Sequence, residues 1–231
     1  QMKKHAVGLV KLLIFSIVTL LLLPIYIFAK FGPGFFSPEI EFSIRSFWSK
    51  LGLSLCNIQV EVRGKIVKNC NVYVCNHVSW LDILTIQSLL KISFVAKSEV
   101  KKWPIFGFLA RIADTVFIER RALAAKSQQI ELLSSLNDGK RLCLFPEGTS
   151  TDGSYILPFK SSLFEIFFLK DKDDNPDFVV QPISLIYLDM NDKVSTSFGW
   201  WGDMNLVSHI YEVVINAKSG TVLVVFEEAL D

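Results

Sequence analysis

An uncharged run near the amino terminus places the strongest constraint on how this 231-residue chain can fold. Leu12 to Ala29 spans 18 residues without a charge, and a lysine stands on either side. As a helix this run would measure about 27 Å, close to the thickness of a bilayer's hydrocarbon core. A cleaved signal peptide is the alternative, but the run is long for one and no Ala-x-Ala-like cleavage site follows. We therefore expect a membrane-embedded helix, which Pro24 kinks or ends.

A second helical pattern follows after a break at the Gly-Pro-Gly of residues 32–34. Apolar residues recur along it at helical spacing, and charged residues occupy its other face. The apolar residues are Ile40, Ile44, Phe47, Trp48, Leu51 and Leu55, and the charged ones are Glu41, Arg45 and Lys50. This amphipathic helix either lies in a membrane interface or packs on a soluble core, and the pattern favours neither. Residues 1–55 are thus expected to form a pair of membrane-anchoring helices.

Short β-like runs alternate with helical stretches from about residue 58 onwards. The strand candidates are residues 58–64, 71–75, 92–96, 114–119, 141–145, 178–188 and 222–228. The helix candidates are residues 81–90, 99–112, 121–136 and 161–170, and Asn-Asp-Gly at 137–139 is a helix stop. Such alternation predicts an α/β domain over residues 56–231, with a mostly buried mixed sheet flanked by helices.

Composition and charge exclude several classes of protein. Apolar residues make up 51% of the chain, which excludes a disordered protein. Lys and Arg number 24 against 23 Asp and Glu, so the net charge of +1 gives no support to nucleic-acid binding. None of the four cysteines lies in a Cys-x-x-Cys pair, which argues against a zinc ribbon or a disulfide scaffold. Free thiols in a reducing compartment are expected.

The first segment that suggests chemistry is NVYVCNHVSWLDIL, in which an apolar strand leads through His77 to a helix that opens near Asp82. Histidine is the side chain best suited to act as a base near neutral pH, and a strand end is a usual place for an active residue in an α/β fold. The His-x-x-x-x-Asp spacing lets the carboxylate reach one imidazole nitrogen and leaves the other free. Two structural alternatives stay open: Ser79-x-x-Asp82 is also a helix-capping pattern, and His77 alone can be a hydrogen-bonded structural residue.

Two further segments carry residues suited to an anionic ligand. In RLCLFPEGTS a strand candidate leads to Gly148, which permits close backbone approach, and to the hydroxyl of Thr149. In TVFIERR another leads to Arg120 and a second arginine, whose planar forks suit phosphate. Residues 91–126 hold eight Lys or Arg against three Asp or Glu, an excess that suits an anionic substrate or membrane surface. Each segment alone also fits an ordinary strand-to-loop exit.

Four segments in order, NHVSWLD, VFIER, FPEGTS and VVQPIS, resemble the four blocks of the lysophosphatidate acyltransferase family of glycerolipid O-acyltransferases. The segment FVAKSEVKKWPIFGFLA also resembles the family's sequence between the first two blocks, and the likeness covers roughly residues 72–183. One His-x-x-x-x-Asp spacing is weak evidence, whereas four blocks in order are specific. The resemblance implies the glycerolipid acyltransferase fold for the domain.

The resemblance also implies roles for individual residues. His77 is the implied general base, and Asp82 is the carboxylate that orients it. The residues implied to hold the glycerol phosphate end of the acceptor are Arg120, Glu147, Gly148 and Thr149. Pro182 belongs to the fourth block, which is implied to shape the acyl or active-site pocket.

Two positions depart from the family's pattern. Asp114 stands where the family often has Gly before the second block, and FKSS at residues 159–162 stands where it often has Phe-Lys-x-Gly. The first is expected to shift charge near the phosphate site, and the second removes a glycine that permits close approach. Both bear on the acceptor's head group more than on the chemistry.

The implied reaction is transfer of a fatty acyl group from an acyl thioester to the free hydroxyl of 1-acylglycerol 3-phosphate, which gives phosphatidic acid. Acyl-CoA or acyl-carrier protein serves as co-substrate, and neither a metal nor a resident cofactor is expected. The alternatives are the same transfer onto another lysolipid, such as lyso-ornithine lipid, and a catalytically silent membrane adaptor. The lack of a Gly-x-Ser-x-Gly motif argues against a serine hydrolase.

The reaction also bears on topology. Basic residues before the first apolar run favour a cytoplasmic amino terminus. A single full crossing would then place His77 outside, away from cytoplasmic acyl thioesters. We therefore expect a re-entrant helix pair, broken at residues 32–34, that keeps the site on the cytoplasmic face of a bacterial inner membrane. A eukaryotic organelle is the other compartment that fits.

Overall fold

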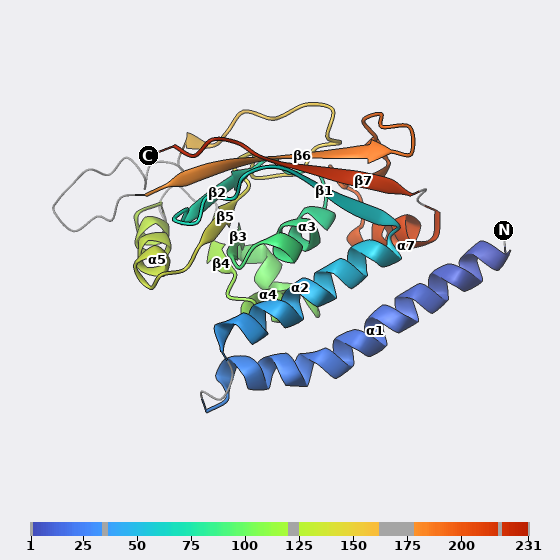
Figure 1. The fold of residues 1–231 in the computed structure, drawn as a ribbon, viewed down its shortest axis with the longest axis horizontal. Helices are drawn as coiled ribbons and strands as arrows, with labels where there is room; N and C mark the ends of the chain where they lie inside the picture. Colours follow the sequence, from blue (N-terminus) through green and yellow to red (C-terminus); the bar gives the residue numbers. More distant parts are fainter. Residues whose placement is uncertain (1, 34–36, 120–124, 162–177, 217–218, 231) are drawn as a thin grey trace.

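The computed structural model describes residues 2–33, 37–119, 125–161, 178–216 and 219–230. Its centre is a seven-stranded sheet in the order β1-β7-β6-β2-β5-β3-β4 (Figure 1). The strands are β1 (Ile58–Gly64), β2 (Val72–Cys75), β3 (Ser93–Lys97), β4 (Val116–Ile118), β5 (Leu142–Leu144), β6 (Val180–Asp189) and β7 (Gly220–Phe226). Each lies at the place of one of the seven predicted strands.

Most neighbouring strands run parallel, and β6–β7 is the one antiparallel pair among the described strands. The expected mixed sheet is therefore confirmed. Parallel pairing brings the carboxyl ends of β2, β5, β3 and β4 to one edge of the sheet. Because the loops after β2, β4 and β5 belong to the first three sequence blocks, this carboxyl edge is where the candidate site lies.

Helices cover both faces of the sheet. The helices of the domain within the described residues are α3 (Leu81–Leu89), α4 (Phe106–Ile112), α5 (Ala125–Asn137) and α7 (Leu206–Asn216), with short 3-10 turns η1 (Ser98–Lys102) and η4 (Thr196–Phe198). Tyr73 and Cys75 of β2 belong to a core cluster with α3 and α7, whereas Val72 and Val74 belong to another with α5. This alternation explains why the strand is apolar throughout.

The prediction of a single helix over residues 99–112 is wrong, because Pro104 separates η1 from α4. η1 ends before Trp103, which is extended with φ −70° and ψ 128°, and α4 begins only after Ile105. Proline lacks the amide that a helix interior needs, and it pushes the preceding residue towards extended backbone. Ile105 then takes a positive φ of 63°, which is strained for a β-branched residue.

The other helix expectations have mixed outcomes. α5 ends at Asn137 as the Asn-Asp-Gly stop predicts, and Gly139 there takes a left-handed φ of 77°. Residues 162–170, most of the last predicted helix, lie outside the described residues. α7 is missing from the predicted helices. It begins after Asn205, whose side-chain oxygen accepts a hydrogen bond from the Ser208 amide at 3.1 Å and so caps the helix.

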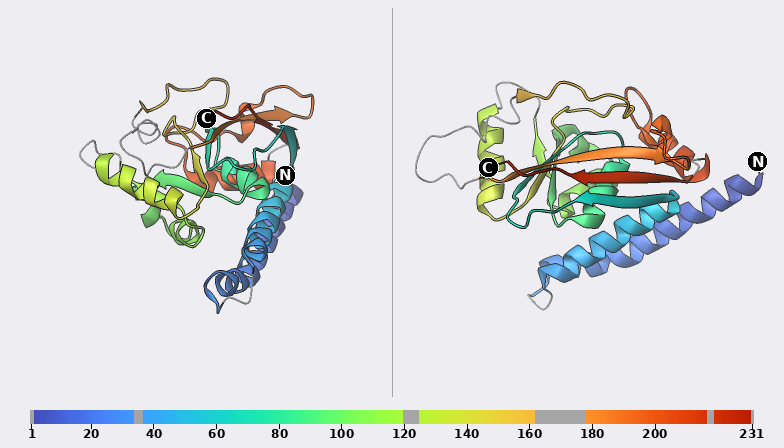
Figure 2. Two further views of the ribbon diagram at one scale, coloured as in Figure 1. Left: turned by 60° about the vertical axis from the view of Figure 1, so that its left-hand side comes forward. Right: turned by 45° about the horizontal axis from the view of Figure 1, so that its top comes forward.

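Two long helices form a hairpin beside the domain. They are α1 (Met2–Phe31) and α2 (Pro38–Leu55), and both views of Figure 2 show them side by side. Pro24 lies inside α1 without ending it. Among the described helices, α1 alone is long and apolar enough to cross a membrane, with a mean hydropathy of 2.7. The helix pair expected on either side of residues 32–34 is therefore present.

The second helix, α2, packs on α3 through small and polar residues. Ser46 donates to the Ser88 carbonyl at 2.7 Å, and Gln87 donates to the Ser49 hydroxyl at 3.2 Å. Packing on the core is therefore confirmed for this face of α2. Arg45, expected on an exposed charged face, is instead buried, because its guanidinium donates to a backbone carbonyl of the domain.

Both ends of α1 contact the domain. Near its start, Gly8 packs so closely on Ile215 of α7 that any side chain at position 8 would collide with it. Near its end, Lys30 donates to the Ile112 carbonyl at 2.6 Å and forms an ion pair with Asp114. A helix whose two ends rest on the same domain lies along that domain.

Candidate active site

The central strand β2 ends at the carboxyl edge, and Asn76 fixes the position of its end. The Asn76 side chain accepts a hydrogen bond from the Leu185 amide at 2.7 Å and donates one to the Leu185 carbonyl at 3.0 Å. These two bonds continue the β2–β6 contact where backbone pairing stops at Cys75. His77 is the next residue, so the sheet sets its position.

His77 and Asp82 form a hydrogen-bonded pair. The His77 Nδ1 atom lies 2.7 Å from Asp82 Oδ2. The same oxygen accepts hydrogen bonds from the amides of Val78 and Ser79, at 2.7 and 2.9 Å. Asp82 therefore caps the turn that opens α3 and contacts the imidazole at the same time. The helix-capping contact and the contact with the imidazole, which the sequence left as alternatives, are therefore both present.

The imidazole of His77 is held with one nitrogen unbonded. Phe145, which follows β5, stacks on it with ring centroids 4.2 Å apart. When Nδ1 donates to the carboxylate, Nε2 is the acceptor, and it has no hydrogen-bond partner among the described residues. The side chain is 18% exposed, so the ring is not sealed inside the protein. It can take a proton from a bound group.

Glu147 is buried and joins two loops of the site. One of its carboxylate oxygens accepts a hydrogen bond from the His77 amide at 2.7 Å, and the other accepts one from the Leu157 amide at 2.8 Å. Backbone donors of this kind stabilise a carboxylate away from water. The implied contact with the acceptor's glycerol phosphate end stays a prediction, and both oxygens already have backbone partners.

Gly148 and Thr149 follow on the same loop. Gly148 has a φ of 68°, a left-handed conformation that favours glycine. The Lys160 side chain lies across it, so a Cβ at this position would collide with the ammonium group. Thr149 is exposed. The loop bonded to His77 therefore presents a hydroxyl and an ammonium group.

The remaining predicted residues have different outcomes. Arg120 lies outside the described residues. Pro182 lies in β6 opposite Val74 of β2, within the body of the sheet, and its role in shaping a pocket stays a prediction. All four cysteines are free and buried, which confirms the expectation of free thiols.

Asp114 stands in place of the Gly of the family's pattern, and it lies just before β4. The Asp114 carboxylate is also paired with Lys30, which offsets its charge. Its φ of 59° is the left-handed conformation that Gly adopts readily and Asp tolerates. Asp114 therefore contributes to the docking of α1, and the expected shift of charge near the phosphate site stays a prediction.

One contact of the site escapes the sequence analysis. The Tyr187 hydroxyl of β6 donates to Asp82 Oδ1 at 2.7 Å. Burial, followed by the charge of Asp82, raises the pKa of Tyr187 well above its usual value, so the hydroxyl remains a donor. Tyr187 lies 105 residues from Asp82 in an apolar strand, and no local pattern marks it. Its polar tip within a buried run is the only signal that the sequence offers.

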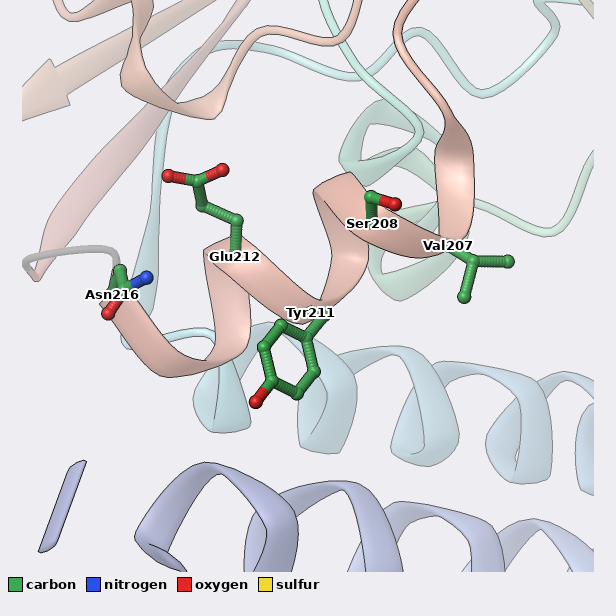
Figure 3. Close-up of a pocket in the computed structure, with 5 residues that line it drawn as sticks. All are labelled: Val207, Ser208, Tyr211, Glu212 and Asn216. Atoms are coloured by element: carbon green, nitrogen blue, oxygen red, sulfur yellow. The ribbon is translucent and has the colours of Figure 1, made fainter. Parts of the chain in front are cut away.

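An open hollow along α7 lies outside this site. It is lined by Val207, Ser208, Tyr211, Glu212 and Asn216. Figure 3 shows Tyr211 pointing towards the amino-terminal helices, where its hydroxyl lies 3.2 Å from His5 Nδ1. None of the lining residues belongs to the four sequence blocks.

Comparison with known proteins gives consistent relatives. A family model described as Acyltransferase matches residues 57–186. The lyso-ornithine lipid O-acyltransferase of Rhodobacter capsulatus is 38% identical over 79% of this chain and 65% of its own length. The protein of the same name from Rhizobium meliloti is 35% identical over 80% of this chain and 65% of its own length. The 1-acyl-sn-glycerol-3-phosphate acyltransferase of Neisseria gonorrhoeae is 35% identical over 50% of this chain and 47% of its own length.

The chain covers only part of the length of its relatives, and the similar solved structure has a low sequence identity. The chain spans 65% of the length of the first two relatives, slightly less than two thirds. The crystal structure of the 1-acyl-sn-glycerophosphate acyltransferase PlsC from Thermotoga maritima resembles this one with a TM-score of 0.65. That similarity covers the whole of this chain and 87% of the other at 20% sequence identity. It confirms the expected fold.

Glu147→Gln is expected to destabilise the protein by about 1–3 kcal/mol, because its amide nitrogen would face a backbone N–H where an oxygen now accepts. The measurement is the free energy of unfolding in detergent. Glu61→Gln is the matched control, since Glu61 is exposed and its pair with Arg63 is expected to contribute about 0–1 kcal/mol. Unchanged stability in Glu147→Gln, with weaker acceptor binding, would instead indicate direct contact with substrate.

Proposed function

The chain belongs to the acyltransferase family, and we propose that it transfers a fatty acyl group from an acyl thioester to the hydroxyl of a lysolipid. The observation that carries this proposal is the unbonded Nε2 of His77, whose other nitrogen contacts the buried Asp82. The names of the relatives described above, all acyltransferases of lysolipids, support the same reaction class.

The proposed mechanism follows from this pair. A lysolipid hydroxyl becomes nucleophilic when His77 Nε2 accepts its proton, and the Asp82 carboxylate stabilises the imidazolium that forms. The hydroxyl oxygen attacks the thioester carbonyl, and the C–S bond breaks as the tetrahedral intermediate collapses. The departing sulfur takes the proton from His77, which restores the neutral imidazole. The reaction as a whole moves one proton from the hydroxyl to the sulfur and one acyl group from the sulfur to the hydroxyl oxygen.

The head group is proposed to bind the loops that follow β4 and β5. Arg120, Gly148 and Thr149 supply a guanidinium, a backbone approach and a hydroxyl. The ammonium of Lys160, which lies across Gly148, adds a positive charge beside the loop after β5. Glu147 holds the loop after β5 in place through its two contacts with backbone amides. An anionic group on the acceptor would complement these residues.

Lyso-ornithine lipid is the acceptor that we favour. Relatives named for that substrate match about four fifths of this chain, at 38% and 35% identity. The relative named for 1-acylglycerol 3-phosphate matches half of it at 35%. An ornithine head group offers a carboxylate in place of a phosphate, and either anion suits the positive loops. 1-Acylglycerol 3-phosphate is therefore the second candidate, favoured by the four sequence blocks. The donor is acyl-CoA or acyl-carrier protein.

Membrane association is proposed to occur through α1 without a full crossing. Large apolar side chains are exposed along the length of α1, as expected of a helix in contact with lipid. Both of its ends contact the same domain, through Gly8 and Lys30, so the helix would lie at the membrane surface or re-enter it. This arrangement would keep His77 on the cytoplasmic side of a bacterial inner membrane, where acyl thioesters are made.

His77→Ala is expected to lower acyl transfer by about 10²- to 10⁴-fold, because the base is lost. Asp82→Asn should also be severe, since the charge that stabilises the imidazolium is removed. The measurement is product formation by purified protein with acyl-CoA and a lysolipid. His5→Ala is the control, because His5 lies on α1 outside the site. Near wild-type turnover in His77→Ala would show that the assignment of the base is wrong.

A panel of acceptors tests the substrate. We expect a higher kcat/KM with lyso-ornithine lipid than with 1-acylglycerol 3-phosphate, with products identified by mass. Arg120→Ala should raise KM for the phosphorylated acceptor more than for an acceptor without phosphate, because an arginine fork suits phosphate. The reverse order of acceptors would favour the second candidate. No transfer to any acceptor from either donor would favour a silent adaptor.

Labelling from one side of sealed vesicles tests the topology. Cysteines placed at Lys3 and Phe31, near the two ends of α1, are expected to react with a membrane-impermeant maleimide from the same side as the catalytic domain. The physical reason is that both ends rest on that domain. The unsubstituted protein is the control, since its four cysteines are buried. Labelling of the two positions from opposite sides would establish a full crossing.

A further inference from the structure

We propose that Tyr187 is a positioning residue for the reaction: its hydroxyl holds Asp82 Oδ1 so that Oδ2 stays directed at His77. The inference rests on the proposed function, because it requires His77 to be the base. Tyr187 touches neither the acceptor nor the donor in this scheme and acts through Asp82.

The first observation is that both oxygens of the Asp82 carboxylate already accept hydrogen bonds. Oδ2 accepts from the imidazole and from two backbone amides, and Oδ1 accepts from Tyr187. Asp82 is 0% exposed, so water does not reach it from the surface. Among the described residues, Tyr187 is the only hydrogen-bond donor to Oδ1. Without it, this oxygen would carry charge in a buried place with no partner.

The second observation is that Tyr187 is itself fixed. It lies in β6, whose neighbour β7 pairs with it at Val222, and its ring packs on Phe198 with centroids 5.8 Å apart. The Asn76–Leu185 bonds fasten β6 to the end of β2 only two residues away. The paired strands therefore hold the Tyr187 hydroxyl beside the loop after β2 before any substrate binds.

The third observation concerns the charges around the pair. Besides His77 and Tyr187, the ionisable groups close to Asp82 include the buried thiols of Cys75 and Cys143. Burial raises the pKa of both thiols, so neither carries charge near neutral pH. Glu147 contacts the His77 amide and not its ring. The Tyr187 hydroxyl is thus a neutral donor that holds the carboxylate oxygen opposite the one that contacts His77.

Tyr187→Phe keeps the ring and removes only this donor. We expect kcat to fall by about 10- to 100-fold, as for loss of a hydrogen bond to a charged group, with little change in the acceptor's KM. The acidic limb of the pH–rate profile should move to higher pH. An uncompensated carboxylate binds protons more readily and holds the imidazole protonated more strongly, and both effects remove the active state at low pH.

Tyr73→Phe is the matched control. Tyr73 is also buried, on β2, and its hydroxyl lies beside the Cys70 thiol and not beside a carboxylate. The same chemical change there should leave kcat and the pH profile near wild type. A second test uses the Asp82→Asn background. If Tyr187 acts through Asp82, adding Tyr187→Phe to Asp82→Asn should cost less than about 3-fold, because the charge to be held is already gone.

The outcomes separate this inference from the proposed function. An active His77→Ala would overturn the proposed base, and the inference with it. An inactive His77→Ala together with a wild-type profile in Tyr187→Phe would overturn the inference alone. A loss in Tyr187→Phe that is equally large in the Asp82→Asn background, without a shift of the acidic limb, would show a structural role only and would also overturn it.

Discussion

The site depends on one buried charge, the carboxylate of Asp82. An ionised carboxylate removed from water is stable only where donors surround it. Its four donors come from residues 77–79 and from Tyr187 on β6, while Asp82 itself lies in the first turn of α3. The buried carboxylate therefore links the loop after β2, the helix α3 and the strand β6. It also orients the imidazole of His77, which is one of its four donors.

The central strands β2 and β5 could be predicted from the sequence because they are buried on both faces and read as apolar runs. In β1, which is largely exposed, Ile58, Val60 and Val62 alternate with polar residues, and that period of two indicates a strand. The errors occurred where tertiary contacts override local pattern. Arg45 falls on the charged face of its helical pattern with Glu41 and Lys50, yet it is buried and donates to a backbone carbonyl of the domain. The helix over 99–112 matched an apolar pattern that continues across Pro104, whereas the backbone does not. α7 lacked a strong stop signal, and its Asn205 cap is a common residue in loops.

The candidate site was predictable to the extent that its contacts are local. His77 and Asp82 are five residues apart, and one turn of backbone brings them together. Tyr187 reaches the same carboxylate from 105 residues away, so only the β2–β6 pairing reveals it. Asp114 is a second such case, because its carboxylate pairs with Lys30 near the end of α1 and no local pattern marks that pair.

The distribution of these partners decides what an anionic acceptor would meet. Glu147 holds the backbone of His77 and Asp82 holds its ring, and the oxygens of both carboxylates are occupied by donors from the protein. Two negative charges next to the imidazole would otherwise repel an anionic head group. Because both are buried, the protein donors around them offset part of that charge. The groups on the loop after β5 include the exposed Thr149 hydroxyl and Lys160 ammonium, and the Asp152 carboxylate lies on the same loop. An anionic head group would therefore be attracted to the part of this loop near Lys160 and repelled by the part near Asp152.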